Sequence, residues 1–147
     1  MIQIMIMIIF ASITIYNLSK YSDILIRAKF TIADIISLII VLILIFVAFK
    51  SIIEKNAINY SLAIVFFLYT ISGIIVRGYN KGGVYDFGRL THIAKFTKWN
   101  QVDSIKFEYF AKDAIDVIFV TKTKAIRHRY DEKYEDSIVK IKKELNI

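Results

Sequence analysis

Residues 98–110 read KWNQVDSIKFEYF and contain the single tryptophan of the chain, Trp99. Toward the end of this stretch the apolar residues Ile105, Phe107 and Tyr109 alternate with charged residues. Because successive side chains of a strand point to opposite faces, this alternation predicts a strand with one buried face. The strand lies in the second half of the chain, whereas the first half has the composition of a membrane protein. The two halves therefore need separate explanations.

Charge and hydrophobicity are divided unequally along the 147 residues. The chain is 56% hydrophobic, with a mean hydropathy of +0.53, yet it contains 20 Lys and Arg against 13 Asp and Glu. Only five of these basic residues and three of the acidic ones lie within residues 1–76. An apolar half followed by a basic half is typical of a membrane anchor joined to a water-facing domain. The absence of cysteine excludes disulfides, a thiolate nucleophile and Cys-based metal sites.

Three apolar runs in the first half are predicted to form transmembrane helices. They cover about residues 2–18, 32–49 and 58–76. A helix rises about 1.5 Å per residue, so roughly 20 residues are needed to cross a hydrocarbon core of about 30 Å. The second and third runs meet this length and the first is short, which gives two or three spans. A secretion signal would need basic residues before its apolar run, whereas the first Lys or Arg of this chain is Lys20.

The distribution of Lys and Arg around the runs predicts the orientation in the membrane. The loop after the first run is basic, and the region after the third run, residues 77–147, is more basic still. Under the positive-inside rule both lie in the cytoplasm. We expect a multi-pass protein of the bacterial cell (plasma) membrane, with its N-terminus outside and its C-terminal domain cytoplasmic. Asp34, near the start of the second run, is expected to be an edge carboxylate that reaches water.

The second half is predicted to form a small α+β domain. Patterns typical of strands occur at residues 83–87, 92–99, 102–110, 115–121 and 124–130. The stretch GYNKGG before them is expected to be a turn that leads out of the membrane. Residues 131–147 carry apolar side chains at a helical spacing of four, three and four, which predicts an amphipathic helix. A run of antiparallel strands closed by one such helix predicts a small, partly open barrel capped by the helix.

The order of these segments resembles a known family. The series GVYDFG, KFTKWNQVDSIKF and IDVIFVT, followed by a basic strand and a terminal helix, is similar to the pleckstrin-homology-like (PH-like) domains of YcxB-like bacterial membrane proteins. The resemblance covers roughly residues 78–147 and the layout of spans before them. It implies a PH-like, partly open antiparallel β-barrel capped by a C-terminal helix. It also implies structural roles for Trp99 and Val102, with the tryptophan packed at a corner between strands.

No pattern typical of catalysis or metal binding is present. His92 and His128 are the only histidines and lie on different expected strands, without a partner at helical spacing. The acidic residues of the second half are scattered through turns and strand ends. Neither a P-loop nor a G-x-S-x-G motif occurs. We therefore predict a protein that is not an enzyme and that has no cofactor and no metal site.

Basic side chains are the remaining candidates for a binding site. They are Lys122, Lys124, Arg127 and Arg129 on one hairpin, and Lys95 and Lys98 on another strand. The alternation of the last strand places Arg127 and Arg129 outward. Near a membrane surface, anionic headgroups attract each basic residue by about 1 kcal/mol. The alternative is a solvated basic rim that only satisfies the positive-inside rule. Nucleic acid is not expected as a partner, because no recognition helix or arginine-rich arm is present.

The sequence favours a membrane-anchored PH-like interaction module at the inner leaflet. It would bind a protein partner or anionic lipid headgroups, without catalysis. One alternative is an immunity or resistance protein against a membrane-active bacteriocin peptide, since small basic membrane proteins with PH-like domains are similar to some immunity proteins of leaderless bacteriocins. Another is an accessory subunit of a transporter or secretion complex.

Overall fold

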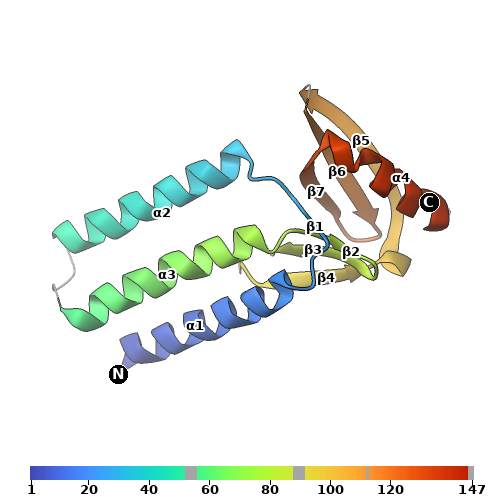
Figure 1. The fold of residues 1–147 in the computed structure, drawn as a ribbon. Coiled ribbons are helices and arrows are strands. Elements are labelled where there is room, and N and C mark those ends of the chain that lie inside the picture. Colours follow the sequence, from blue (N-terminus) through green and yellow to red (C-terminus); the bar gives the residue numbers. More distant parts are fainter. Residues whose placement is uncertain (52–55, 88–91, 112, 146–147) are drawn as a thin grey trace.

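The computed structural model describes residues 1–51, 56–87, 92–111 and 113–145 and combines long helices with a small α+β domain (Figure 1). The long helices lie side by side and the domain sits at one end of them. The helices are α1 (Ile2–Tyr21), α2 (Ile32–Ser51) and α3 (Ala57–Ile75), and the domain contains a fourth helix, α4 (Glu135–Leu145).

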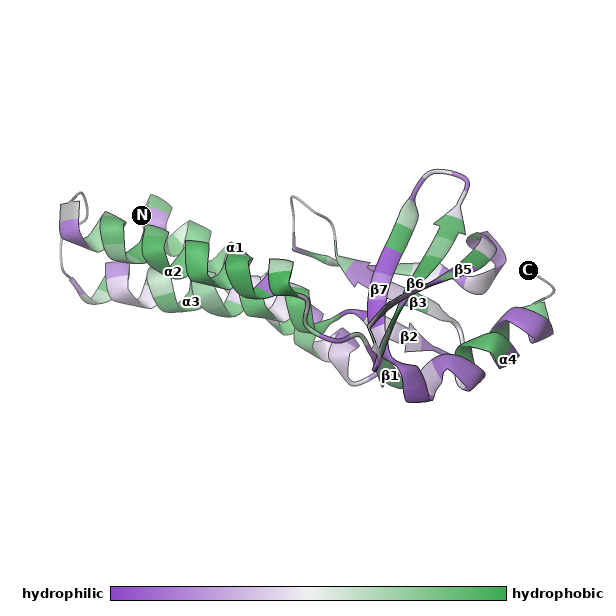
Figure 2. Ribbon diagram, turned by 90° about the horizontal axis from the view of Figure 1, so that it is seen from above, coloured by the Kyte–Doolittle hydropathy of each residue, from purple (hydrophilic) through white to green (hydrophobic). Residues whose placement is uncertain are grey.

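Helices α1, α2 and α3 are each long and apolar enough to cross a membrane. In Figure 2 the ribbons of these helices are coloured mostly as hydrophobic, whereas the ribbon of the domain mixes hydrophobic and hydrophilic residues. Most of their large apolar side chains are exposed, which is stable where lipid is the surrounding solvent. The rings of Phe10 in α1 and Tyr69 in α3 stack at 4.8 Å, and Phe49 in α2 stacks on Tyr60 in α3 at the same distance. These features indicate membrane association, and the direction of insertion stays a prediction.

The strands of the domain form two separate antiparallel sheets. The first has the order β1 (Ile26–Arg27), β2 (Gly78–Asn80), β3 (Gly83–Phe87) and β4 (Ala94–Lys98). The second has the order β5 (Val102–Ala111), β6 (Ala114–Thr121) and β7 (Ala125–Asp131). A short 3-10 helix, η1 (Trp99–Gln101), connects β4 to β5. The two sheets form an open structure and not a closed barrel.

The first sheet includes a strand from the anchor half of the chain. Ile26 of β1 pairs with Tyr79 of β2, although the two residues are far apart in sequence. The chains approach closely here, since a Cβ atom on Gly78 would lie 2.4 Å from the Ile26 carbonyl oxygen. Residues 78–80, expected to be part of a turn, are therefore a strand. The domain also extends beyond the expected range 77–147, because β1 belongs to it.

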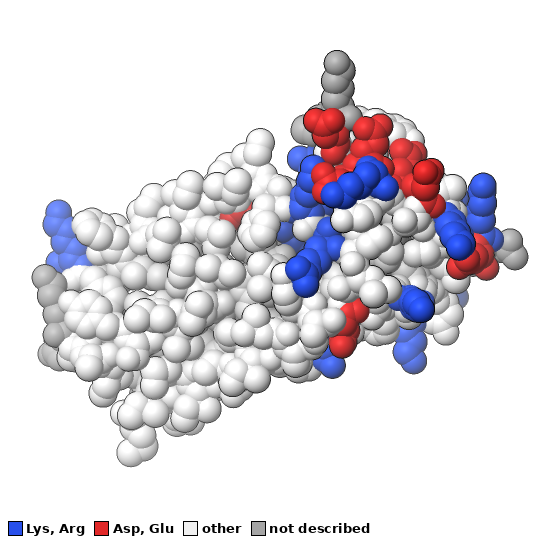
Figure 3. Space-filling model, viewed as in Figure 1, with Lys and Arg blue, Asp and Glu red and all other residues white. Residues whose placement is uncertain are grey.

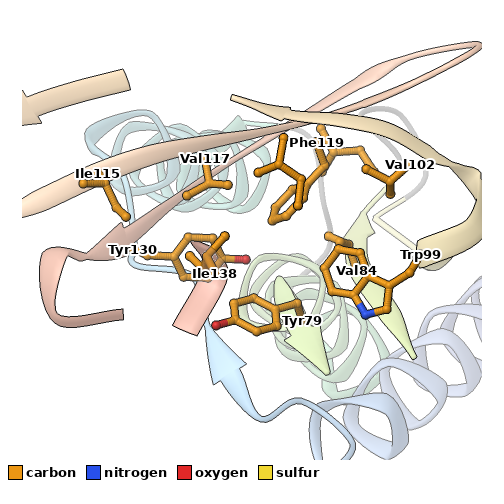
Figure 4. Packing of buried hydrophobic residues seen from close by; sticks show 11 residues of the cluster. Tyr79, Val84, Trp99, Val102, Ile115, Val117, Phe119, Tyr130 and Ile138 are labelled. Atoms are coloured by element: carbon orange, nitrogen blue, oxygen red, sulfur yellow. The ribbon is translucent and has the colours of Figure 1, made fainter. Parts of the chain in front are cut away.

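The hydrophobic core lies between the two sheets and under α4 (Figure 4). On β6, alternate residues face inward and are completely buried, as the alternation predicts: Ile115, Val117 and Phe119. Ile138 of α4 closes the core from one side and is 1% exposed. The expected amphipathic helix is thus present, although it begins at Glu135, after a single 3-10 turn.

Trp99 occupies the corner where the chain passes from the first sheet to the second. Its indole N–H donates to the Asn80 carbonyl oxygen at 3.1 Å. Its ring lies 6.1 Å from that of Tyr79 and 5.8 Å from that of Phe119, one on each sheet. Val102, the first residue of β5, is also buried. Both residues therefore contribute to the core and neither lies on the surface.

Candidate functional site

A buried asparagine attaches the domain to the helices. Asn17, near the end of α1, is completely buried. Its amide nitrogen donates to the Ser72 hydroxyl of α3 at 2.9 Å and to the His92 carbonyl oxygen at 2.7 Å. Its amide oxygen accepts from the main-chain N–H of Ala94, the first residue of β4, at 2.8 Å. One side chain thus joins two helices to the first sheet.

A glycine in α3 allows this close attachment. A Cβ atom on Gly73 would lie 2.8 Å from the Cβ and 2.9 Å from the carbonyl oxygen of His92. Such distances are not compatible with a side chain at this position. The ring of His92 also stacks on that of Phe87 in β3 at 5.3 Å. The segment before β4 is therefore held against the helix without a gap.

Asp34 does not behave as the exposed edge carboxylate expected from the sequence. It is 7% exposed and pairs with Arg77, which is 8% exposed, at 2.5 Å between Nη2 and Oδ2. The same carboxylate accepts from the main-chain N–H and the hydroxyl of Thr31, at 2.6 and 2.8 Å. The Thr31 hydroxyl accepts in return from the Asp34 N–H, so the two residues form a capping box at the start of α2. The ion pair connects α2 to the residue just before β2.

The basic residues named from the sequence occupy three different environments. Figure 3 shows most Lys and Arg gathered on the domain, with few charges on the helices. Lys95, Lys122 and Lys124 line one groove of about 610 Å³. Its remaining lining comes from β4, η1, the start of β5, the end of β6 and the turn between β6 and β7: Phe96, Thr97, Asn100, Gln101, Asp103, Thr121 and Thr123. We call this the basic groove. Lys98 is exposed but is not part of its lining.

The two arginines lie on the outer face of the second sheet, away from the basic groove. Arg127 pairs with Glu108 of β5. Arg129 forms two hydrogen bonds with Asp116 of β6, at 2.6 and 3.0 Å, and these bonds raise the pKa of the guanidinium. Arg129 is half-buried and not exposed as expected, because Asp116 beside it is itself buried. Both arginines are paired with neighbouring carboxylates, and they do not line the same groove as Lys95, Lys122 and Lys124.

A chain of polar groups leads from the basic groove into the core. Lys124 lies 3.6 Å from one carboxylate oxygen of Asp86, and the other oxygen lies 3.5 Å from Nε2 of His128. Nδ1 of His128 is 3.0 Å from the Tyr130 hydroxyl. Burial lowers the pKa of His128, although the carboxylate of Asp86 acts in the opposite direction. A ligand that draws Lys124 away from Asp86 would therefore change the surroundings of a buried histidine.

Within the described residues, no group of three or more His, Asp or Glu side chains is arranged to hold a metal ion. His92 and His128 lie in different places, the first against α3 and the second in the core of the domain. The basic groove offers ammonium groups, hydroxyls and amides. These groups can donate hydrogen bonds to an anion.

The comparisons with known proteins give no identity. No family model, curated protein or solved structure matches the chain. The resemblance to YcxB-like proteins therefore stays a prediction.

Sequence reasoning grouped the basic residues by proximity in the chain, and the fold groups them differently. It placed Lys122 and Lys124 with the arginines of the same hairpin, whereas they share the basic groove with Lys95 of another sheet. It missed the pairing of Asp34 with Arg77. The T-x-x-D pattern of residues 31–34, a capping-box signature, would have fixed the first turn of α2 but not the partner.

Proposed function

We propose that this protein is a membrane-anchored, non-catalytic binding module whose α+β domain takes an anionic partner in the basic groove at the cytoplasmic surface of the cell membrane. The order of a four-stranded sheet, a three-stranded sheet and a terminal helix supports a PH-like classification. The three apolar helices support the anchoring. The orientation rests on the positive-inside rule.

The observation that carries the proposal is the charge of the basic groove. Three lysines line it and Asp103 is the one acid in the lining. Within the described residues, no ion pair includes Lys95 or Lys122. Like charges held around one depression repel each other, and an anion that enters the groove relieves this repulsion. The lining threonines and Asn100 supply further hydrogen-bond donors for carboxylate or phosphate oxygens.

The rigid attachment of the domain supports a role next to the membrane. Ala94 is bonded to α1 through Asn17, so β4 begins at the level where the helices end. A strand advances about 3.3 Å per residue, so the groove extends outward from this level toward Gln101. In the proposed orientation, the inner end of the groove faces the lipid headgroups and its outer end faces the cytoplasm, where a protein segment can reach it.

The absence of cysteine from the chain allows a direct test. A Thr123→Cys variant of the full chain, labelled with an environment-sensitive fluorophore, is placed in nanodiscs of neutral lipid. Three probes are compared: a short polyglutamate peptide, inorganic phosphate, and nanodiscs that contain anionic lipid. We expect a saturable signal with at least one probe. The signal should weaken as salt increases, since exposed charges are screened beyond about 8–10 Å.

Two triple variants separate the groove from general positive charge. Replacing Lys95, Lys122 and Lys124 with Gln should abolish the signal. Replacing three lysines outside the groove removes the same charge and should leave most of the signal: Lys133, Lys140 and Lys143. The proposal is wrong if no probe gives a signal, or if both triple variants lose it equally.

A further inference from the structure

We propose that the basic groove receives an acidic protein segment in extended conformation, which adds as a strand to the free edge of β4. This inference rests on the proposed function and names the partner. Strand addition combines main-chain hydrogen bonds with side-chain contacts on alternate positions.

The hydrogen-bond pattern of β4 shows which main-chain groups face away from its sheet. Within the described residues, β4 pairs with β3 alone. The N–H of Trp99 donates to the Gly82 carbonyl oxygen at 3.1 Å. In an antiparallel ladder, bonded and non-bonded pairs alternate, so Thr97 and Lys95 are the next residues that bond toward β3. The main-chain groups of the residues between them, Ala94, Phe96 and Lys98, point away from β3.

The N–H groups of two of these three residues already donate hydrogen bonds. The N–H of Ala94 donates to Asn17, and the N–H of Lys98 donates to the side-chain oxygen of Gln101 at 3.2 Å. Natural sheets protect their edges in such ways. Phe96 is different, because its N–H and C=O form no hydrogen bond with any residue that the structure describes. The edge of β4 is thus closed at both ends and open at one residue in the middle.

The open residue lies in the wall of the basic groove. Phe96 belongs to the lining, between Lys95 and Thr97. Cross-strand partners share a face of the sheet, and Thr97 is opposite Val84, a core residue. Lys95 is therefore on the inner face, toward Lys124 and the turn between β6 and β7. The Phe96 side chain is on the outer face, where it is 41% exposed and packs on Tyr85 at 4.7 Å.

This arrangement predicts the pattern of the bound segment. The residue that pairs with Phe96 would place its side chain on the outer face, next to the exposed phenyl ring, so an apolar residue fits there. Its two neighbours would point to the inner face, toward the lysines, so acidic residues fit there. The expected core of the ligand is acidic–apolar–acidic. A phosphate or a lipid headgroup can use the lysines but has no extended main chain that pairs with both the N–H and the C=O of Phe96.

The test uses the full chain in neutral-lipid nanodiscs and a labelled peptide, acetyl-Glu-Glu-Leu-Glu-Glu-amide. A second peptide of the same sequence carries an N-methyl group on the leucine nitrogen, which removes the paired N–H and keeps the charge. We expect the N-methylated peptide to bind at least about tenfold more weakly, because a buried carbonyl is then left unpaired. Inorganic phosphate and anionic lipid are measured in parallel.

Hydrogen exchange of the unmodified protein gives an independent result. The amide of Phe96 should exchange quickly without ligand and slowly with the peptide. The amide of Thr97, which bonds within the sheet, should be slow in both cases.

A matched pair of variants tests the same hydrogen bond from the protein side. Phe96→Pro removes the N–H without breaking the ladder to β3, since this N–H faces outward. Phe96→Ala keeps the N–H and loses only the ring. We expect the proline variant to bind the peptide more weakly than the alanine variant. If the proline variant does not fold, the exchange and N-methylation results decide.

The outcomes separate this inference from the proposed function. Slowed exchange at Phe96 together with a loss of binding on N-methylation supports strand addition. Peptide binding without either effect overturns it, since charge alone then explains the binding. Binding of phosphate or anionic lipid without peptide binding also overturns it and leaves the proposed function intact. If no anion binds, both fail.

Discussion

Breaking the buried ion pair between Asp34 and Arg77 should destabilise the protein strongly. Removing one partner of a buried pair costs about 3–5 kcal/mol, because the other charge stays buried without compensation. Without Arg77, the Asp34 carboxylate still accepts two hydrogen bonds from Thr31. Without Asp34, the Arg77 guanidinium still donates to the Ile74 carbonyl oxygen and still lies over the ring of Phe87, 5.4 Å from its centroid. We therefore expect about 3 kcal/mol for Arg77→Met and about 5 kcal/mol for Asp34→Asn.

The double variant gives the sharper expectation. With both charges removed, no ion is left buried, and Met occupies much of the volume of the arginine. Replacing a whole buried pair with neutral groups is often close to neutral in stability. The Asp34→Asn, Arg77→Met protein should therefore be more stable than either single variant. The free energy of unfolding is measured on the full chain in detergent micelles. Fluorescence reports on the domain, because Trp99 is the single tryptophan.

A surface pair serves as the control. Lys29 and Asp131 form an ion pair with side chains 37% and 35% exposed, so Lys29→Met should cost no more than about 1 kcal/mol. The reasoning fails if the two buried single variants cost as little as this control. It also fails if their effects simply add in the double variant, because charges in contact must be coupled.

Three further predictions concern packing, pH and orientation. Trp99→Ala should lower the free energy of unfolding of the full chain by about 3–5 kcal/mol, and an unchanged melting temperature would exclude a packing role for the ring. Burial lowers the pKa of His128 in the folded protein. As the pH falls below about 6.5, the imidazole is therefore protonated in the unfolded chain before it is protonated in the folded one. The melting temperature should therefore decrease as the pH falls below about 6.5. A His128→Gln variant, which keeps Asp86, should lack this decrease. For orientation, Lys50→Cys should react with an impermeant thiol reagent on intact cells and Thr123→Cys only after permeabilisation; the reverse pattern would invert the topology.

Local patterns in the sequence determined the long helices and most of the strands. An apolar run of about 20 residues needs no distant partner to form a helix in lipid, because all its main-chain hydrogen bonds are internal. The alternation of Ile105, Phe107 and Tyr109 likewise predicted strand β5, and Ile105 is in the core at 1% exposed. Tyr109, expected on the same buried face, is instead 67% exposed, and its hydroxyl donates to Glu135 of α4. The alternation of β7 correctly placed Ile126 and Tyr130 in the core. In each case the information lies within a few neighbouring residues.

Features formed by distant residues depended on the tertiary structure. Strand β1 has only two residues and exists because it pairs with β2, which itself lies within a stretch expected to be a turn. The partner of Asp34 is 43 residues away, and the single open residue of β4 is defined by side chains from α1 and η1. A salt bridge or a groove depends on which surfaces meet, and no local propensity records this. The sequence therefore determined an anchor and a small α+β domain, whereas packing alone decided which lysines share a groove and which cations are already paired.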